Sequence, residues 1–358
     1  NQNLGTDFEE APMPWLYHHY AGHDNNRDFF MGNLVETRHM FRLMFDDWAP
    51  QLYFDQHQMG NGGARMFVPP FPDPQSPDIP PLLHQQIRLL GGAIVTDLQA
   101  AGKKGVLTGE MYRIYGQEGA LNYRFHNIVS VMTETASVRI ASPLEQEDGG
   151  DNPVRRGGRG STLNPREFSG AVVDPWKGGT WRLGDIVDYQ TIAVRAVLKQ
   201  AARNREDFLF NQWLMAQETF ERAETEGPYA WVISADQHDP NTAVDMVRRL
   251  MMQGIEVYQA TESFDAIPAC SPLPKPWADP RPTEDEDEAS EETEGEAADE
   301  EEAEEAGEAE EGEAVEGEAE AGEGEQAEAD EEAVEAEPEP VTYPAGSYVI
   351  PGAQRGRP

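Results

Sequence analysis

The chain has 358 residues, with 67 acidic side chains against 27 Lys and Arg, and a formal net charge of −40. Residues 283–340 contain 31 of the acids and no Lys or Arg, so the rest of the chain is only mildly acidic. This balance excludes a nucleic-acid binder that works by charge. The single cysteine, Cys270, excludes a disulfide scaffold, and the longest nearly apolar stretch, 89–95, is far below the ~20 residues of a membrane span.

The first 226 residues alternate between helical and strand patterns, which predicts a mixed α/β fold. Seven segments follow from apolar periodicity and from the positions of Gly and Pro. In chain order, they are a helix over 36–48, a short buried strand over 51–55, a Gly/Pro-rich loop over 60–81, a helix over 82–101, a buried strand over 127–135, an irregular segment over 145–185 and a long helix over 188–225.

A small α/β module is expected from residue 227 onward. Residues 230–234 and 255–260 have strand composition, and the helix between them begins at the N-cap Asp239 and ends at Gly254. This βαβ order implies parallel pairing of the two strands. Residues 346–351 have the pattern of a strand that returns to the module.

The acidic segment 283–340 is predicted to be disordered, because it has too few large apolar residues to offset the entropy of ordering. Since a strand follows it, the segment is an insert rather than a tail. The expected organisation is therefore a domain over 1–226, a module over 227–282, the insert, and a returning strand with a tail over 341–358.

Three short motifs place polar side chains where chemistry is expected. The first contains Asn26 and Arg27 in a loop, and a guanidinium beside an amide is suited to binding a carboxylate. The alternative is a structural Arg that ties the loop together.

The second motif places His57 after an apolar strand, where the chain opens into a Gly-rich loop. Imidazole in this position can bind zinc, although a lone His can also be an ordinary hydrogen-bonding residue. The third motif places Glu134 at the end of an apolar strand. A carboxylate there is suited to act as a general base near a metal, or alternatively as a capping residue.

The three motifs together resemble the M14 zinc carboxypeptidases. The resemblance lies in the order and spacing of Asp24–Phe29, Asp55–His57 and Thr133–Thr135. The amino-acid sequence of 14–226 is also similar to a bacterial branch of that family. Residues 231–240 resemble the C-terminal extension of the same branch. The resemblance implies an α/β domain with a mixed sheet and a bound zinc ion.

The resemblance also implies a role for each motif. His57 would be a zinc ligand, Glu134 would be the base that activates the zinc-bound water, and Asn26 and Arg27 would hold the terminal carboxylate of the substrate. A mobile Tyr of the family corresponds best to Tyr112, with Tyr115 and Tyr123 as rivals.

The chain departs from the family in one respect. In the family, the first two zinc ligands come from a His-x-x-Glu element upstream of the Asn-Arg pair. In this chain, residues 1–25 contain neither this element nor any Arg or Lys. From the resemblance, we therefore expect that this chain lacks the N-terminal third of the domain.

The expected function of the intact protein is zinc-dependent removal of C-terminal residues from peptides or proteins, and this chain alone is expected to be inactive. The alternatives are a non-catalytic peptide-binding protein on the same scaffold, and an amidase or deacylase. The resemblance and the single Cys predict an exported bacterial protein, either secreted or periplasmic, with no nucleic-acid partner.

Overall fold

The computed structural model describes residues 3–6, 9, 22–110, 119–139, 142–146, 164–269 and 339–354. Tyr112 and Tyr115 therefore lie outside the described residues, as does the acidic insert apart from its last two positions.

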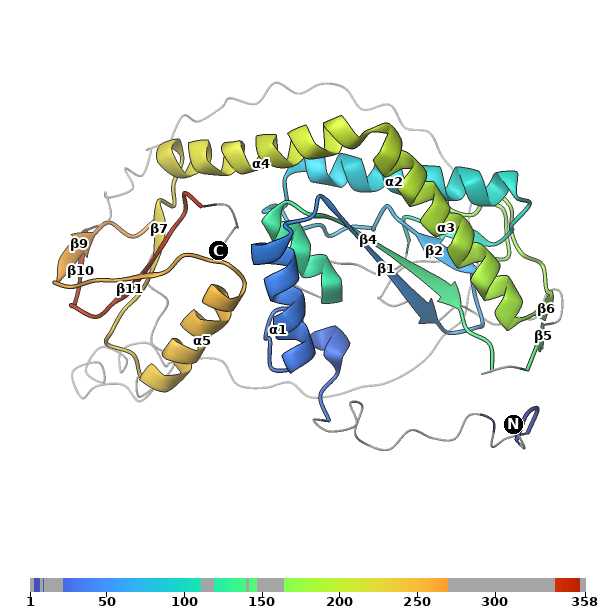
Figure 1. The fold of residues 1–358 in the computed structure, drawn as a ribbon, viewed down its shortest axis with the longest axis horizontal. Helices are drawn as coiled ribbons and strands as arrows, with labels where there is room; N and C mark the ends of the chain where they lie inside the picture. The colour runs from blue at the N-terminus through green and yellow to red at the C-terminus, as the bar shows by residue number, and fades with distance from the viewer. Residues whose placement is uncertain are drawn as a thin grey trace, which may run out of the picture. The chain divides into compact units, whose positions relative to one another are not determined.

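The main sheet has four strands in the order β1 (Leu52–Met59), β4 (Val129–Ala136), β2 (Met66–Val68) and β3 (Val106–Thr108) (Figure 1). The pairs β1–β4 and β2–β3 are parallel, whereas β2 and β4 are antiparallel. The predicted mixed α/β class is confirmed. β4 is buried along its whole length, as expected. β1 is longer than predicted and only half-buried, because it lies at the edge of the described sheet.

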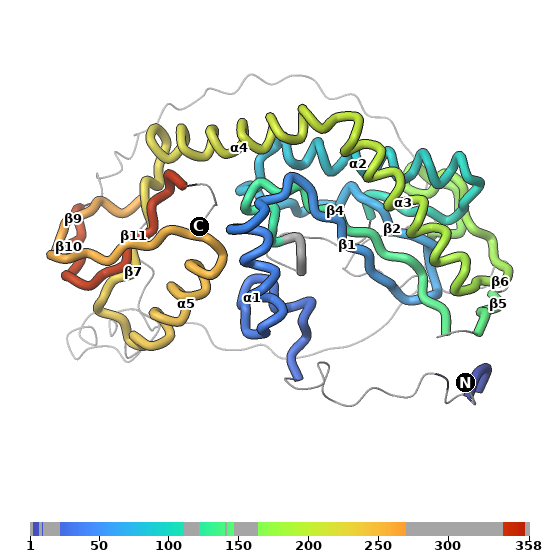
Figure 2. The backbone as a smooth tube through the Cα atoms, in the orientation of Figure 1, coloured from blue at the N-terminus to red at the C-terminus, as the bar shows by residue number. Residues whose placement is uncertain are grey.

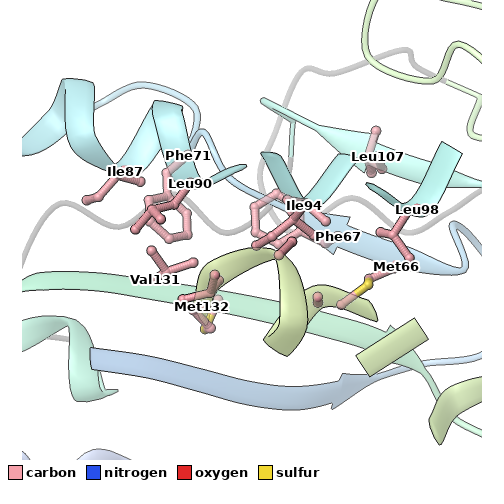
Figure 3. Close-up of a cluster of buried hydrophobic side chains, with 14 of the residues drawn as sticks. Met66, Phe67, Phe71, Ile87, Leu90, Ile94, Leu98, Leu107, Val131 and Met132 are labelled. Atoms are coloured by element: carbon pink, nitrogen blue, oxygen red, sulfur yellow. The ribbon is translucent and has the colours of Figure 1, made fainter. Parts of the chain in front are cut away.

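Two helices, α2 (Pro81–Ala100) and α3 (Leu183–Arg203), pack against each other and against β4 (Figure 1). α2 presents one apolar stripe, spaced three or four residues apart, to the sheet. Its fully buried members are Leu83, Ile87, Leu90, Ile94 and Leu98, and several of them meet Phe67, Val131 and Met132 in Figure 3. Each such side chain stabilises the fold by about 1.5–3 kcal/mol.

The segment 60–81 is not a simple loop, which corrects the sequence prediction. It contains β2, and its backbone packs tightly on α2 at Gly91. A Cβ at Gly91 would lie 2.1 Å from the carbonyl oxygen of Pro69, so only glycine permits this approach. β2 escaped prediction because its three residues are surrounded by proline and glycine.

A second apolar cluster includes Phe41, Phe45 and Tyr123. It joins α1 (Val35–Phe41), the π-helical turn η2 (Arg42–Asp47) and the 3-10 helix η3 (Gly119–His126) to the Tyr53 face of β1. The other face of β1 contributes Leu52 and Phe54 to the main core. Because side chains alternate along a strand, Tyr53, Asp55 and His57 share the face toward α1.

The predicted helix over 188–225 is two helices, which is a second correction. α3 ends at Asn204, whose backbone is not helical and whose side-chain amide donates to Gln200, and α4 (Arg205–Thr225) begins immediately afterward. The irregular segment contains β6 (Gly179–Trp181), which pairs with β5 (Leu144–Gln146). No helix in the described part of the chain is long and apolar enough to cross a membrane.

The small module contains β7 (Ala230–Ile233), α5 (Pro240–Met252) and β8 (Tyr258–Gln259). The Asp239 side chain accepts hydrogen bonds from the first turn of α5, as the sequence predicted. The expected direct pairing of β7 with β8 is wrong, because β11 (Tyr348–Pro351) lies between them and is antiparallel to both. Figure 2 shows β7 and β11 side by side. β9 (Phe264–Ala266) and β10 (Val341–Tyr343) form a separate two-stranded sheet.

Candidate functional site

The parallel pairing of β1 with β4 brings two predicted site residues together. His57 is the register partner of Glu134, and neighbouring side chains in register lie on the same face of a sheet. Glu134 is only 8% exposed, whereas His57 is half-buried. Both strands continue for two residues beyond these positions, so the pair lies near the strand ends rather than at them.

Asp55 orients the His57 ring. His57 Nε2 donates to the Asp55 carboxylate at 2.7 Å, across the two-residue spacing that puts both side chains on one face. This contact leaves Nδ1 as the nitrogen for a metal or a second partner, and a carboxylate behind an imidazole is the usual support of a zinc-binding histidine. α3 holds the same strand through Gln190, whose side chain donates to the His57 carbonyl.

The groups around His57 favour its protonated form. The hydrogen bond to Asp55 raises the pKa of His57 above its ordinary value, and burial opposes this change. The carboxylate of Glu134 also raises the pKa, and the guanidinium of Arg27 lowers it.

The loop that carries Arg27 is built around two aspartates. Residues Asn25–Arg27 form a single 3-10 turn, η1, whose first residue follows Asp24. Asp24 Oδ1 accepts from the Asn26 N–H at 2.8 Å and caps the turn. Asp28 is fully buried and accepts from the backbone N–H groups of Asn33 and Leu34 at 2.9 and 2.8 Å.

Asp28 is held as a carboxylate despite its burial. Burial raises the pKa of Asp28, but the hydrogen bonds from Leu34, Thr37, Asn33 and His23 lower it further, so the pKa is below its ordinary value. The acids beside Arg27 are therefore engaged with the loop backbone, and they leave the guanidinium to the solvent.

The Arg27 side chain is exposed, and its Nη1 donates to the Asn26 carbonyl at 3.1 Å. Within the described ranges, no carboxylate forms an ion pair with it. A guanidinium of this kind can receive a planar anion through two parallel hydrogen bonds. The Asn26 side chain is half-buried beside it.

The structure makes His57 and Glu134 register partners on paired strands, and the charge of Arg27 lowers the pKa of His57. The structure does not place Tyr112, which lies outside the described residues. Tyr123, a rival for the same role, is fully buried, and its ring packs edge-on against Phe45 and Tyr53. Tyr123 is a core residue.

Sequence reasoning missed the part that Asp55 plays, although its spacing from His57 is a usable signal.

Among the described residues, no group of three or more His, Cys, Asp or Glu could hold a metal ion. Two surface pockets lie elsewhere, one between the Pro-rich loop and α2 and one between η2 and α4, and neither is lined by His57 or Glu134.

Comparison of the chain with protein-family models, curated proteins and solved structures found no match.

Proposed function

We propose that the chain belongs to a zinc-dependent carboxypeptidase of the M14 type, which removes C-terminal residues from peptides. The observation that supports this function best is the pairing of His57 with Glu134 across β1 and β4, with Asp55 behind the imidazole. Two residues that the motifs singled out, His57 and Glu134, are register partners on paired strands, and the charge of Arg27 acts on the same histidine.

Each residue has a role that suits its surroundings. Glu134 is buried beside the imidazole, so its carboxylate is suited to take a proton from the attacking water and deliver it to the leaving amine. Arg27 is exposed and has a charge that no described acid neutralises, so it is suited to hold the terminal carboxylate of the substrate. Asn26 adds a neutral donor next to it.

His57 fits one zinc ligand, because Asp55 engages Nε2 and leaves Nδ1 for the metal. A catalytic zinc site normally has three protein ligands, so the other two would come from outside the described residues. Zinc supplies a Lewis acid that polarises the scissile carbonyl and promotes ionisation of water.

Binding of two matched peptides tests the proposal. The peptides are identical except that one has a free C-terminal carboxylate and the other an amide. With zinc present, we expect the free acid to bind roughly a hundredfold more tightly, because two charge-assisted hydrogen bonds contribute about 1.5–3 kcal/mol each. Arg27→Ala should abolish the difference. Arg42→Ala, at an exposed arginine in η2, is the control and should keep it.

Turnover is tested by release of the C-terminal residue. Where wild type cleaves the free acid, Glu134→Gln should lower kcat by about 10²–10⁴-fold, as expected for loss of a general acid–base, and leave the dissociation constant nearly unchanged. Equal binding of acid and amide by wild type would contradict the proposal.

A binding protein without turnover is the second candidate. It would use the same exposed guanidinium of Arg27, which is suited to hold a carboxylate whether or not a metal is bound. This function predicts the same preference for the free acid and the same effect of Arg27→Ala. It also predicts no release of the C-terminal residue at saturating zinc.

A further inference from the structure

The loop that follows Arg27 has an unusual set of hydrogen bonds. Five consecutive backbone carbonyls each accept a hydrogen bond from a side chain. The pairs are Phe29 with Asn122 Nδ2 (2.8 Å), Phe30 with Gln253 Nε2 (3.0 Å), Met31 with Arg249 Nη1, Gly32 with Arg38 Nε (2.7 Å) and Asn33 with Arg38 Nη2 (3.2 Å).

Three of these donors come from distant parts of the sequence. Asn122 lies in η3, and Arg249 and Gln253 lie at the end of α5 in the small module. Gln253 is 7% exposed and joins the two elements, because its Oε1 accepts from Asn122 Nδ2 at 2.9 Å and its carbonyl accepts from His126 Nε2 at 2.8 Å.

The Arg249 side chain is held on α5 by a second set of hydrogen bonds. Asp245, one helical turn earlier on α5, accepts from Arg249 Nε and Nη2 at 3.0 and 2.8 Å. Arg249 Nη1 then donates to the Met31 carbonyl and to Asn33 Oδ1, the latter at 2.9 Å. The guanidinium therefore bridges α5 and the loop.

These contacts bear on Arg27 because the loop is short and internally bonded. Asp28 connects Arg27 directly to Phe29, and its carboxylate binds the N–H groups of Asn33 and Leu34. A surface loop without such contacts opens locally at little free-energy cost. A loop held at both its carbonyls and its N–H groups keeps the backbone of Arg27 in one place, which lowers the entropy lost when an anion binds.

We propose that α5 is a positioning element for the carboxylate-binding loop. Arg249 and Gln253 touch no substrate. They hold the backbone that presents Arg27, so the small C-terminal module sets how strongly a terminal carboxylate is bound. This inference rests on the proposed function of Arg27. It adds that the module acts on substrate binding as well as on folding.

The test compares two adjacent arginines of α5. Arg249→Gln removes the bridge, whereas Arg248→Gln removes the same charge from an exposed residue next to it. Hydrogen exchange of the backbone amides of 31–34 reports the loop, and the dissociation constants of the free-acid and amide peptides report binding. Arg249→Gln should speed exchange and weaken free-acid binding, each by roughly tenfold, since its two hydrogen bonds to the loop are lost. Binding of the amide peptide should not change, and Arg248→Gln should change neither readout.

Gln253→Met is a second variant that removes the Phe30 and Asn122 contacts and should act in the same direction. The inference is overturned if wild type prefers the free acid but Arg249→Gln leaves that preference intact, or if exchange in 31–34 is unchanged. If wild type itself does not distinguish acid from amide, the proposed function of Arg27 fails as well, and the exchange data then show separately whether α5 orders the loop.

Discussion

The two halves of the candidate site are positioned by different forces. His57 and Glu134 lie on paired strands that are packed against α2 and α3, so burial of apolar side chains fixes them. Arg27 lies on an irregular loop that is fixed by hydrogen bonds to its backbone, two of them from α5. We call His57 and Glu134 the strand half of the site and the Arg27 loop the loop half. Packing makes the strand half depend on the global stability of the domain, whereas the loop half can open locally while the domain stays folded.

This difference predicts how each half responds to substitution. Damage to the core should lower the free energy of unfolding and affect both halves together. Damage to the loop contacts should change carboxylate binding and should lower the free energy of unfolding by less than damage to the core. Four substitutions test the comparison, from the largest expected effect to the smallest.

The largest effect is expected in the core that supports the strand half. Leu90→Ala removes a fully buried side chain of α2 and should lower the free energy of unfolding by about 2–5 kcal/mol through lost burial and the cavity that remains. Leu89→Ala is the matched control, because Leu89 is 49% exposed, and it should change stability by less than about 0.5 kcal/mol. Urea denaturation measures both, and equal effects would contradict the packing shown for α2.

The next largest effect is expected at Asp28, the anchor of the loop half. Asp28→Asn keeps the shape and removes the charge that accepts from Asn33 and Leu34. Because hydrogen bonds to charged groups contribute about 1.5–3 kcal/mol each, the substitution should lower the free energy of unfolding by about 2–3 kcal/mol. Asp46→Asn, at an exposed position in η2, is the control. A loss at Asp28 no larger than at Asp46 would show that the loop is not anchored there.

The lowered pKa of Asp28 predicts how the stability of the protein depends on pH. The folded pKa of Asp28 is below its ordinary value, so its stabilisation is fully present above the unfolded pKa of about 3.9 and is lost as the pH falls through the lower folded pKa. The stability difference between wild type and Asp28→Asn should therefore stay constant from neutral pH to about pH 5 and shrink below about pH 4. Urea denaturation across this range measures it, and a difference that grows toward acid would contradict the assignment.

A smaller effect on stability is expected at Arg27 itself. Its side chain is exposed and, among the described residues, bonds only to the neighbouring Asn26 carbonyl, so Arg27→Ala should change the free energy of unfolding by less than about 0.5 kcal/mol while it abolishes the preference for a free carboxylate. A thermal melt beside the binding measurement separates the two. A loss of stability comparable with that of Asp28→Asn would assign Arg27 a structural role.

The strand half was largely predictable from the sequence, because its signals are local. The apolar run of β4, the stripe of α2 and the cap of α5 at Asp239 each occupy a few neighbouring residues. Prediction failed where structure depends on distant partners. β2 has only three residues in a Pro-rich segment, and β11 reaches its place between β7 and β8 from beyond the acidic insert.

The same division applies to the candidate site. The motifs placed His57 and Glu134 each near the end of a strand, and Asp55 was within reach of the same reasoning, but the pairing of the two strands came only from the structure. The contacts that hold the Arg27 loop had no sequence signal, because Gln253 is 223 residues from Phe30 and 131 from Asn122. The function, the zinc site and the disorder of 283–340 stay predictions.

The smallest overall effect is expected from a surface ion pair that joins the two core helices, because its loss should change stability little and carboxylate binding not at all. Lys199 Nζ on α3 lies 3.3 Å from Asp97 Oδ1 on α2, with the two side chains 45% and 30% exposed. Solvent and salt screen such a pair, so Lys199→Gln should lower the free energy of unfolding by no more than about 0.2–1 kcal/mol. Lys199→Arg keeps the charge and should have no effect. If Lys199→Gln instead destabilised the protein as much as Leu90→Ala, the contact between α2 and α3 would depend on charge. The strand half, like the loop half, would then be positioned by polar interactions. A small, salt-sensitive loss supports apolar packing as the force that holds His57 and Glu134 in register.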